Sequence, residues 1–450
     1  MLPAHPLEQR VGMEFYCTDS PGLGGRLRER FEDFIVEEIT PEGSVLSLGD
    51  WSSEPVSEAQ LAASVTGERS KYVKFTLQKM GLSTLDAAGI ISAALKIPRY
   101  LVTYAGLKDK RAMTVQAMSV SRQASVALGG LRLSRIVLRD LEYVRRPVQV
   151  GDLWGNRFTL LLKNMTVDCN AGCEMVESFK GRSILNYFGI QRFGVTQPST
   201  LLAGKALIKR DYESAVRRIV AAASISEEDT PTNVGEGSSP DTEITESMLD
   251  RVSTGARYER SVIQHLIKHP GDYQKAMTRI PPRILTLLVH SYQSYLFNRL
   301  LSERVRSGSS IDQPEIGDFI IQLDETHSGR DSWLYTTERT LEERRTMVRS
   351  GRYGLAAPVP GYSTKLPPSR QSDYLRSILS AEGVALVDFR NPESRALDSP
   401  GGLHLVSMEP SNLCAECTEN SLRLQFSLRK GSYATVFLRE LMKGDPRDLI

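Results

Sequence analysis

The chain lacks long hydrophobic runs. No uninterrupted apolar stretch among its 450 residues approaches the roughly 20 residues that a transmembrane helix needs. The first 21 residues also lack the apolar core of a signal peptide, because charged side chains interrupt them. We therefore expect a cytoplasmic protein without membrane association. Its hydrophobic share of 40% is typical of a globular protein, and its length suffices for two domains.

Cysteine is scarce, with five residues in the chain, which does not indicate a disulfide scaffold. Cys414 and Cys417 form a C-x-x-C motif, and Cys169 and Cys173 lie four residues apart. Together they could bind zinc, but the second spacing is loose and no histidine lies close in sequence. We interpret the cysteines as ordinary reduced thiols and predict neither a metal site nor a cofactor.

Net charge is almost absent, at +2, but the charges are unevenly distributed. Residues 99–163 contain twelve Lys or Arg against four Asp or Glu, whereas residues 224–250 contain eight acidic residues and no basic one. A local basic excess is typical of a surface that binds a polyanion. The acidic segment is rich in Ser, Thr, Pro and Gly, so we predict a mobile loop there that avoids nucleic acid.

One basic segment, 104–116, holds a single carboxylate. Asp109 is flanked by Lys108, Lys110 and Arg111. The residues before and after this run are typical of strands, so Asp109 is predicted to lie on a tight loop. Nearby positive charge favours the ionised form of a carboxylate, which suits a nucleophile or a cation anchor better than a proton donor. From these residues alone, a charged surface turn is the simpler interpretation.

Periodicity predicts the elements around this loop. Alternating side chains indicate a strand over 26–39, with Arg26, Arg28 and Arg30 on one face, and further strands over 71–77, 154–163 and 422–428. A helix capped by Ser83 or Thr84 is expected to reach about residue 97. Residues 131–143 could form a basic edge strand or a helix. Helices are predicted over 199–222, 256–269 and 282–304.

The Asp109 loop and four other segments resemble the motifs of the TruD family of tRNA pseudouridine synthases. The loop matches the family pattern Ala-Gly-x-Lys-Asp-(Lys/Arg)-x-Ala-x-Thr-x-Gln. Residues 155–160 (GNRFTL), 186–194 (NYFGIQRFG) and 431–440 match in the family's order, as do residues 32–37 (EDFIVE) near the start. Five ordered matches across nearly the whole chain are not explained by chance.

The resemblance implies an α+β fold in which a pseudouridine-synthase-like mixed sheet forms the catalytic domain and a second, α-rich domain is inserted. The catalytic domain would be discontinuous, formed by residues 1–187 and 402–450. The inserted TRUD domain would span 188–401 and form the opposite wall of an RNA cleft. We expect a monomer, since no obligatory protein partner is evident.

The resemblance also implies a reaction, the conversion of a uridine in tRNA, number thirteen in the D-arm, to pseudouridine. Asp109 would be the catalytic residue that attacks or deprotonates the nucleotide. Arg28 lies at a basic family position, where other members can have lysine, and would keep that carboxylate ionised and aimed. The other predicted substrate contacts are Asn156, Phe158, Tyr433, Lys108 and Lys110, of which Phe158 and Tyr433 would sandwich the base.

Two other functions remain open. A non-catalytic protein that binds structured RNA could share this fold, but it would not need Asp109, which is present. A metal-dependent nuclease needs clustered carboxylates beside its basic surface, whereas Asp109 stands alone in its segment.

Overall fold

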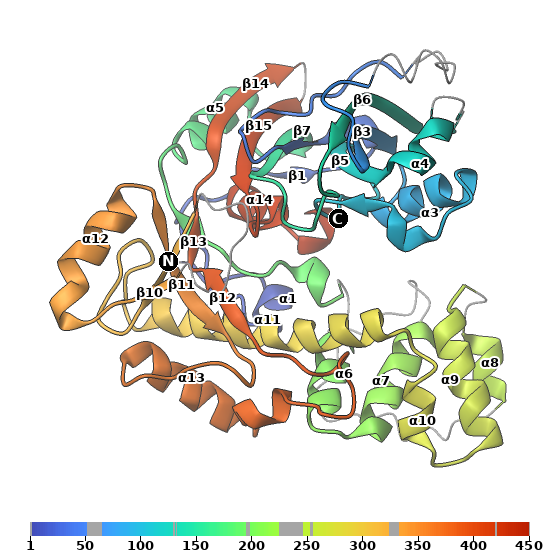
Figure 1. Cartoon of the computed structure of the whole chain (residues 1–450). Helices are drawn as coiled ribbons and strands as arrows, with labels where there is room; N and C mark the ends of the chain where they lie inside the picture. Colours follow the sequence, from blue (N-terminus) through green and yellow to red (C-terminus); the bar gives the residue numbers. More distant parts are fainter. Residues whose placement is uncertain are drawn as a thin grey trace.

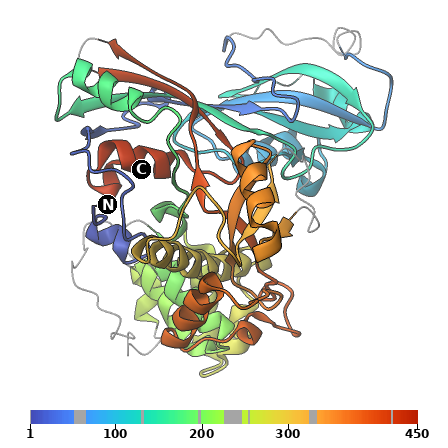
Figure 2. The same ribbon diagram turned by 90° about the vertical axis from the view of Figure 1, so that its left-hand side faces the viewer.

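The computed structural model describes residues 2–51, 65–128, 131, 133–194, 199–224, 246–252, 255–323, 333–418 and 421–449. The described chain has a sheet-rich part and a helix-rich part, which meet along the long helix α11 (Pro282–Arg306) (Figures 1 and 2). Within these ranges, no helix combines the length and the apolar character needed to cross a bilayer.

A large mixed sheet forms the first part. Its strands run in the order β14 (Ser411–Thr418), β15 (Ser421–Arg429), β7 (Gly155–Met165), β2 (Phe34–Ile39), β5 (Met113–Ser121), β3 (Tyr72–Met80) and β6 (Ile136–Val144). Two short strands, β1 (Gly24–Arg26) and β4 (Thr103–Tyr104), pair with β7 and β5. β2 and β5 are parallel, and the other neighbouring strands are antiparallel. Strands from the beginning and the end of the chain therefore share one sheet.

Helices α3 (Thr84–Ala94), α4 (Arg122–Ser125), α5 (Cys169–Glu177) and α14 (Ala434–Met442) cover this sheet, and α1 (Pro6–Gln9) is tied to α14 by the Glu8–Arg439 ion pair. The first part also contains 3-10 turns at 31–33, 99–101, 126–128, 190–192 and 446–449. On one face, Phe437 of α14 packs edge-on against Phe426 of β15, with ring centroids 4.7 Å apart. This face carries the core that supports the Asp109 loop.

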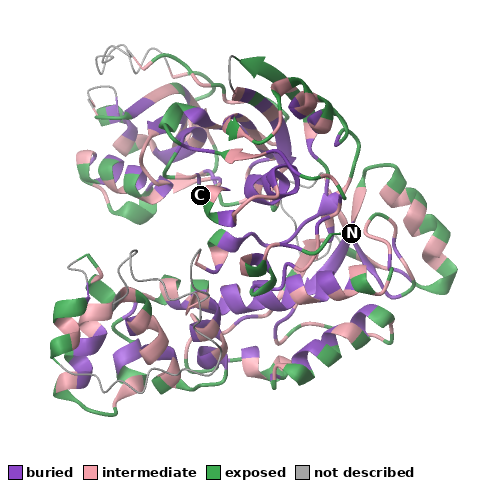
Figure 3. Cartoon of the chain, turned by 180° about the vertical axis from the view of Figure 1, so that it is seen from behind, coloured by how far each residue is buried: buried purple, intermediate pink, exposed green. Residues whose placement is uncertain are grey.

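The second part contains more than helices. Its helices are α6 (Ser199–Ile208), α7 (Tyr212–Ser224), α8 (Ser247–Arg251), α9 (Arg257–Lys268), α10 (Tyr273–Met277), α11, α12 (Leu341–Arg349) and α13 (Arg370–Ala381), with 3-10 turns at 338–340 and 386–389. A four-stranded sheet runs in the order β10 (Trp333–Tyr335), β9 (Phe319–Gln322), β11 (Tyr353–Val359) and β12 (Gly402–Leu405). Figure 3 shows α11 largely buried at the centre.

The mixed α+β class predicted from the sequence is confirmed by this architecture. The division at 188 and 401 stays a prediction, and strand pairing bears on its second boundary. β12 pairs with β11 of the second part, whereas β13 (Ser407–Met408) pairs with β8 (Ile184–Leu185) of the first. We therefore propose that the chain returns to the first part near residue 406.

Most predicted elements form, with local corrections. Ser83 caps α3, and residues 136–144 form the edge strand β6. The predicted strands over 71–77, 154–163 and 422–428 form except at residues 71 and 154. The predicted helix over 199–222 breaks in two, because Arg210 adopts a positive φ of 59° between α6 and α7. Most of the predicted acidic loop at 224–250 lies outside the described residues, and residues 247–251 form α8.

Two predictions are wrong. The strand expected over 26–39 is interrupted, since β1 ends at Arg26, Arg28 has a left-handed φ of 62°, and Arg30 caps a short 3-10 turn before β2. The three arginines therefore do not share a strand face. The cysteines are also not all reduced thiols, because Cys169 and Cys417 form a disulfide between α5 and β14.

Candidate active site

Asp109 lies on the loop between β4 and β5, as predicted, and polar contacts fix the residues before it. The Gln116 side-chain amide donates to the Gly106 carbonyl over 3.0 Å. The Thr84 hydroxyl accepts from the Lys108 backbone N–H at 2.8 Å and donates to the Gln116 side chain at 3.0 Å. Thr84 begins α3 and Gln116 lies within β5, so the loop is anchored to a helix and to a strand.

A buried lysine fixes Asp109 itself. Lys79, on β3, is fully buried, and its ammonium donates to the backbone carbonyls of Asp109 at 3.0 Å and Leu82 at 2.6 Å. Burial lowers the pKa of Lys79 to about 8, and the negative charge of Asp109 opposes this shift. Lys79 was not predicted as a site residue, although it positions the backbone that carries the candidate catalytic carboxylate.

Lys108 points away from the Asp109 carboxylate. Its ammonium forms a buried ion pair with Glu38 of β2, at 2.6 Å, and the other Glu38 oxygen accepts from the Ala117 N–H at 3.0 Å. The two charged side chains are 3% and 1% exposed. A charge pair held in this way ties the loop to the central strands, which favours a positioning role for Lys108 over direct contact with a substrate.

Arg28 is the cation that meets the Asp109 carboxylate. Its guanidinium lies 3.6 Å from Asp109 Oδ1, and the Arg28 side chain is only 4% exposed, whereas that of Asp109 is 36% exposed. The guanidinium also stacks over the Phe34 ring, 3.9 Å from its centroid. Burial lowers the pKa of Arg28, and Asp109 opposes this shift, but arginine keeps its proton at any physiological pH. The carboxylate is thus accessible and faces a fixed positive charge.

The sheet register puts Asn156 and Phe158 on the same face as this machinery. Phe158 lies opposite Val36, which lies opposite Thr114, and Thr114 lies opposite Lys79. Residues directly opposite one another point to the same side of a sheet, as do alternate residues of one strand. Asn156 therefore shares the face, and its Oδ1 is buried without a hydrogen-bond partner among the described residues.

Phe158 is a core residue in this conformation. It is 5% exposed, and its ring stacks on Phe426 at 5.2 Å between centroids and meets Phe34 edge-on at 6.3 Å. The expected stacking of a base on Phe158 stays a prediction, and these contacts mean that it would require a rearrangement. Tyr433 is more accessible, being half-buried at the N-terminal cap of α14, with its ring 6.1 Å from that of Phe188.

Lys110 and Arg111 are exposed. Arg111 is close enough to Arg28 to lower the pKa of that guanidinium further. Of the predicted cations, Lys110 and Arg111 therefore face solvent, Arg28 faces the carboxylate and Lys108 faces the interior.

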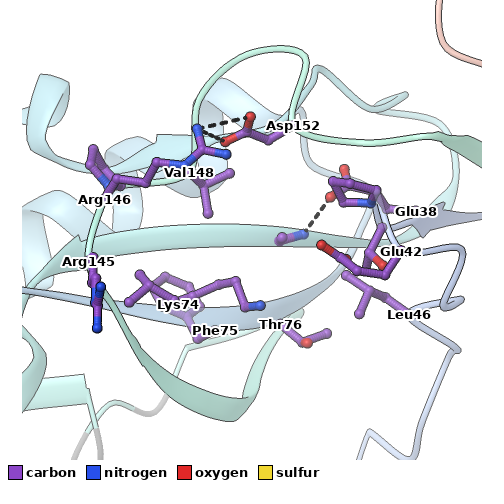
Figure 4. A pocket seen from close by; sticks show the side chains of 15 residues that line it. Glu38, Glu42, Leu46, Lys74, Phe75, Thr76, Arg145, Arg146, Val148 and Asp152 are labelled. Atoms are coloured by element: carbon purple, nitrogen blue, oxygen red, sulfur yellow. Dashed lines mark hydrogen bonds and ion pairs between the residues drawn. The ribbon is translucent and has the colours of Figure 1, made fainter. Parts of the chain in front are cut away.

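A cavity of about 500 Å³ lies beside the sheet, lined by residues that include Glu38, Lys74, Arg146 and Asp152 (Figure 4). Its cations lie next to acids, since Lys74 is 2.6 Å from Glu142 and Arg146 is 3.3 Å from Asp152. Asp109 is not among the residues that line it. We therefore do not assign this cavity to the candidate site.

Comparison with known proteins identifies relatives along the whole chain. The family model described as tRNA pseudouridine synthase D matches residues 10–441. A probable tRNA pseudouridine synthase D from Natronomonas pharaonis is 34% identical to this chain, and the match covers 100% of both chains. One of the same name from Methanosarcina acetivorans is 29% identical over 98% of this chain and 97% of its own length. A crystal structure of a Methanosarcina mazei protein described as tRNA pseudouridine synthase D matches with a TM-score of 0.75 and 28% identity. The match covers 99% of this chain and 100% of that chain.

Proposed function

Because the chain belongs to the TruD family of tRNA pseudouridine synthases, we propose that it isomerises a uridine of tRNA, number thirteen in the D-arm, with Asp109 as the attacking group. In this reaction the N1–C1′ bond breaks, the uracil turns, and a C5–C1′ bond forms. The C5 proton is lost and N1 gains one, so the product is an isomer of the substrate. An aspartate that attacks either C1′ of the sugar or C6 of the base would serve as nucleophile.

The observation that carries the proposal is the contrast between Asp109 and its surroundings. Its carboxylate is 36% exposed, whereas the Arg28 side chain beside it is 4% exposed, and the Asp109 backbone is held by the buried Lys79. A nucleophile must be both accessible and fixed in direction. Arg28 would aim the carboxylate. Lys79 on β3 and Lys108 on the Asp109 loop would position the backbone.

The remaining predicted residues have distinct roles in this proposal. Tyr433, which is half-exposed, would cover one face of the extruded base. Asn156 would donate its side-chain amide to the base or ribose, and its unpartnered Oδ1 leaves capacity for a further hydrogen bond. Phe158 would stack on the opposite face of the base, which requires its ring to leave Phe426 and Phe34. The exposed Lys110 and Arg111 would contact the phosphate backbone of the tRNA.

Extrusion of the uridine has an energetic cost. Unstacking and unpairing a base costs a few kcal/mol, which contacts to the phosphate backbone must offset. Such contacts release counterions, so the affinity for tRNA should fall steeply with salt. We expect a linear, negative dependence of log Ka on log salt concentration that becomes shallower by about one when Lys110 is replaced by Gln. An unchanged slope in that variant would assign the backbone contact to other residues.

The central test compares Asp109→Asn with wild type on unmodified tRNA in EDTA. Asn keeps the shape of Asp but cannot act as the nucleophile, so we expect pseudouridine only with wild type. Asp140→Asn is the matched control, because Asp140 is an exposed acid on the edge strand β6. Carbodiimide treatment followed by primer extension maps the product, which should appear at uridine thirteen. Equal product from Asp109→Asn and wild type would reject the mechanism, and product elsewhere would reject the D-arm assignment.

The alternative, a non-catalytic RNA-binding protein, makes a different prediction. It would bind tRNA with the same salt dependence but yield no pseudouridine with the wild-type chain. A metal-dependent nuclease would instead shorten the tRNA, and EDTA would prevent this. The accessible, fixed carboxylate of Asp109 favours catalysis over both alternatives.

A further inference from the structure

Three cysteine sulfurs converge where helix α5 covers the edge strand β14. Figures 1 and 2 both show α5 beside β14. Three strands, β15, β7 and β2, separate β14 from β5, which follows the Asp109 loop. Cys169 and Cys417 form a disulfide between the two elements. The Sγ of Cys173 lies 3.8 Å from the Sγ of Cys417, which is close to van der Waals contact.

The helix explains this arrangement. Cys169 and Cys173 are four residues apart on α5, so both face the same side, one turn from each other. Asp168 caps the helix by accepting from two backbone N–H groups, which fixes its first turn against the strand. The Cys417 sulfur is thus bonded to the Cys169 sulfur and lies beside the free thiol of Cys173.

We propose that Cys169, Cys173 and Cys417 form a thiol–disulfide exchange site. The Cys173 thiolate attacks the Sγ of Cys417, a Cys173–Cys417 bond forms, and the Cys169–Cys417 bond breaks. Cys173 gives its proton to solvent and Cys169, released as a thiolate, takes one up. The number of disulfides is unchanged, so no external oxidant or reductant is needed.

The surroundings of Cys173 set the pace of this exchange. Burial raises the pKa of its thiol, and Cys414 and Glu177 add to the effect. The thiolate is the attacking form, so only a small fraction of Cys173 is reactive at neutral pH. Exchange should therefore be slow, on the scale of minutes to hours that is typical of uncatalysed disulfide rearrangement.

The exchange preserves a long-range link. Cys169 and Cys417 are separated by 248 residues, and the whole predicted insertion lies between them. Whichever helix cysteine bonds to Cys417, α5 stays tied to β14 and the two segments of the first part stay joined. The attachment point moves by one helical turn, which provides a second way to hold the same elements together. This inference does not depend on the proposed reaction at Asp109.

The experiment determines which cysteines are free thiols. Protein purified without reductant is kept at neutral pH for several hours, labelled with N-ethylmaleimide, digested, reduced and labelled with iodoacetamide. Tandem mass spectrometry then assigns each label to a cysteine. In wild type we expect maleimide on both Cys169 and Cys173, in different molecules, with Cys417 protected.

Two variants and one control make the result decisive. In Cys173→Ser, Cys169 should never carry maleimide, because no thiol can displace it. In Cys169→Ser, dissolved oxygen should oxidise the Cys173 and Cys417 thiols to a disulfide, so Cys417 should remain protected. Cys414→Ser should match wild type. Circular dichroism shows whether each variant is folded.

Three outcomes would overturn the proposal. Maleimide on Cys173 but never on Cys169 in wild type would show a static disulfide. Complete labelling of Cys417 in a folded Cys169→Ser variant would show that Cys173 cannot reach it. Stoichiometric zinc in the purified protein that is lost in Cys417→Ser would show that the thiolates bind a metal instead.

Discussion

Replacement of Lys79 by Met tests how Asp109 is held. The Lys79 ammonium donates to the Asp109 carbonyl over 3.0 Å, and Met keeps an unbranched side chain, one atom shorter, without this donor. A hydrogen bond to a charged group contributes about 1.5–3 kcal/mol, and each 1.4 kcal/mol of lost transition-state stabilisation is a factor of about ten in rate. We expect the single-turnover rate of pseudouridine formation to fall about ten- to a hundredfold, with the affinity for tRNA unchanged.

The same lysine predicts opposite pH trends for stability and for activity. Its pKa falls from an ordinary value of 10.5 to about 8 in the folded protein. Between these values the unfolded chain binds more protons than the folded one, so the free energy of unfolding rises with pH in this window. Below pH 8 the buried charge costs about 3 kcal/mol. Activity should instead fall above pH 8, as the ammonium loses its charge.

The variant should lose both trends. At pH 7, Lys79→Met removes a buried charge, so its free energy of unfolding in urea should equal or exceed that of wild type, although its rate is lower. Lys74→Met is the control, because Lys74 lies on the same strand with 38% of its side chain exposed and should change the rate less than twofold. A wild-type rate and pH profile in Lys79→Met would refute the positioning role, and a parallel loss of rate and stability would reduce Lys79 to a structural contact.

Three further changes are predicted. Glu38→Gln leaves its buried lysine partner unpaired and should destabilise the fold by about 3–5 kcal/mol in urea titration, whereas the exposed Glu32→Gln should change little. Arg28→Lys replaces a fork with a point charge and should lower the single-turnover rate about tenfold, without loss of stability. Gly204→Ala would bring a Cβ within 2.1 Å of a carbonyl oxygen on α11 and should cost about 1–3 kcal/mol of stability, whereas Gly89→Ala, which meets no atom within 4 Å, should add about 0.5–1 kcal/mol.

Local patterns predicted the elements well. The alternation over 71–77 and 154–163 predicted strands that the structure contains, and Ser83 caps the helix whose start it predicted. These features depend on residues that are close in sequence, which is the information that periodicity holds. The strand over 26–39 was wrong because its alternation does not reveal the positive φ at Arg28, a conformation that non-glycine residues rarely adopt.

Strand parity in the sequence marks the two residues, Lys79 and Glu38, that support the Asp109 loop. Lys79 has the same strand parity as Val73, Phe75 and Leu77, so its side chain is expected to point into the core. Glu38 has the same parity as Phe34 and Val36. A charged side chain at an inward position must find a partner, but the sequence does not name it, because the partners lie 30 and 70 residues away. Inward parity could have marked both residues as candidates.

The position of Tyr433 depends on contacts far from the carboxylate. Arg439, five residues after the start of α14, is 2% exposed and donates to both carboxylate oxygens of Glu8, at 2.8 and 2.9 Å, and to the Phe15 carbonyl. A charge buried in this way is stable only with its partner. The helix that presents Tyr433 is therefore fixed by the first residues of the chain, while Asp109 is fixed by β3 and α3. The pairing of β15 with β7 joins the strand that precedes α14 to the rest of the sheet, so the candidate site is a property of the assembled sheet rather than of any one motif.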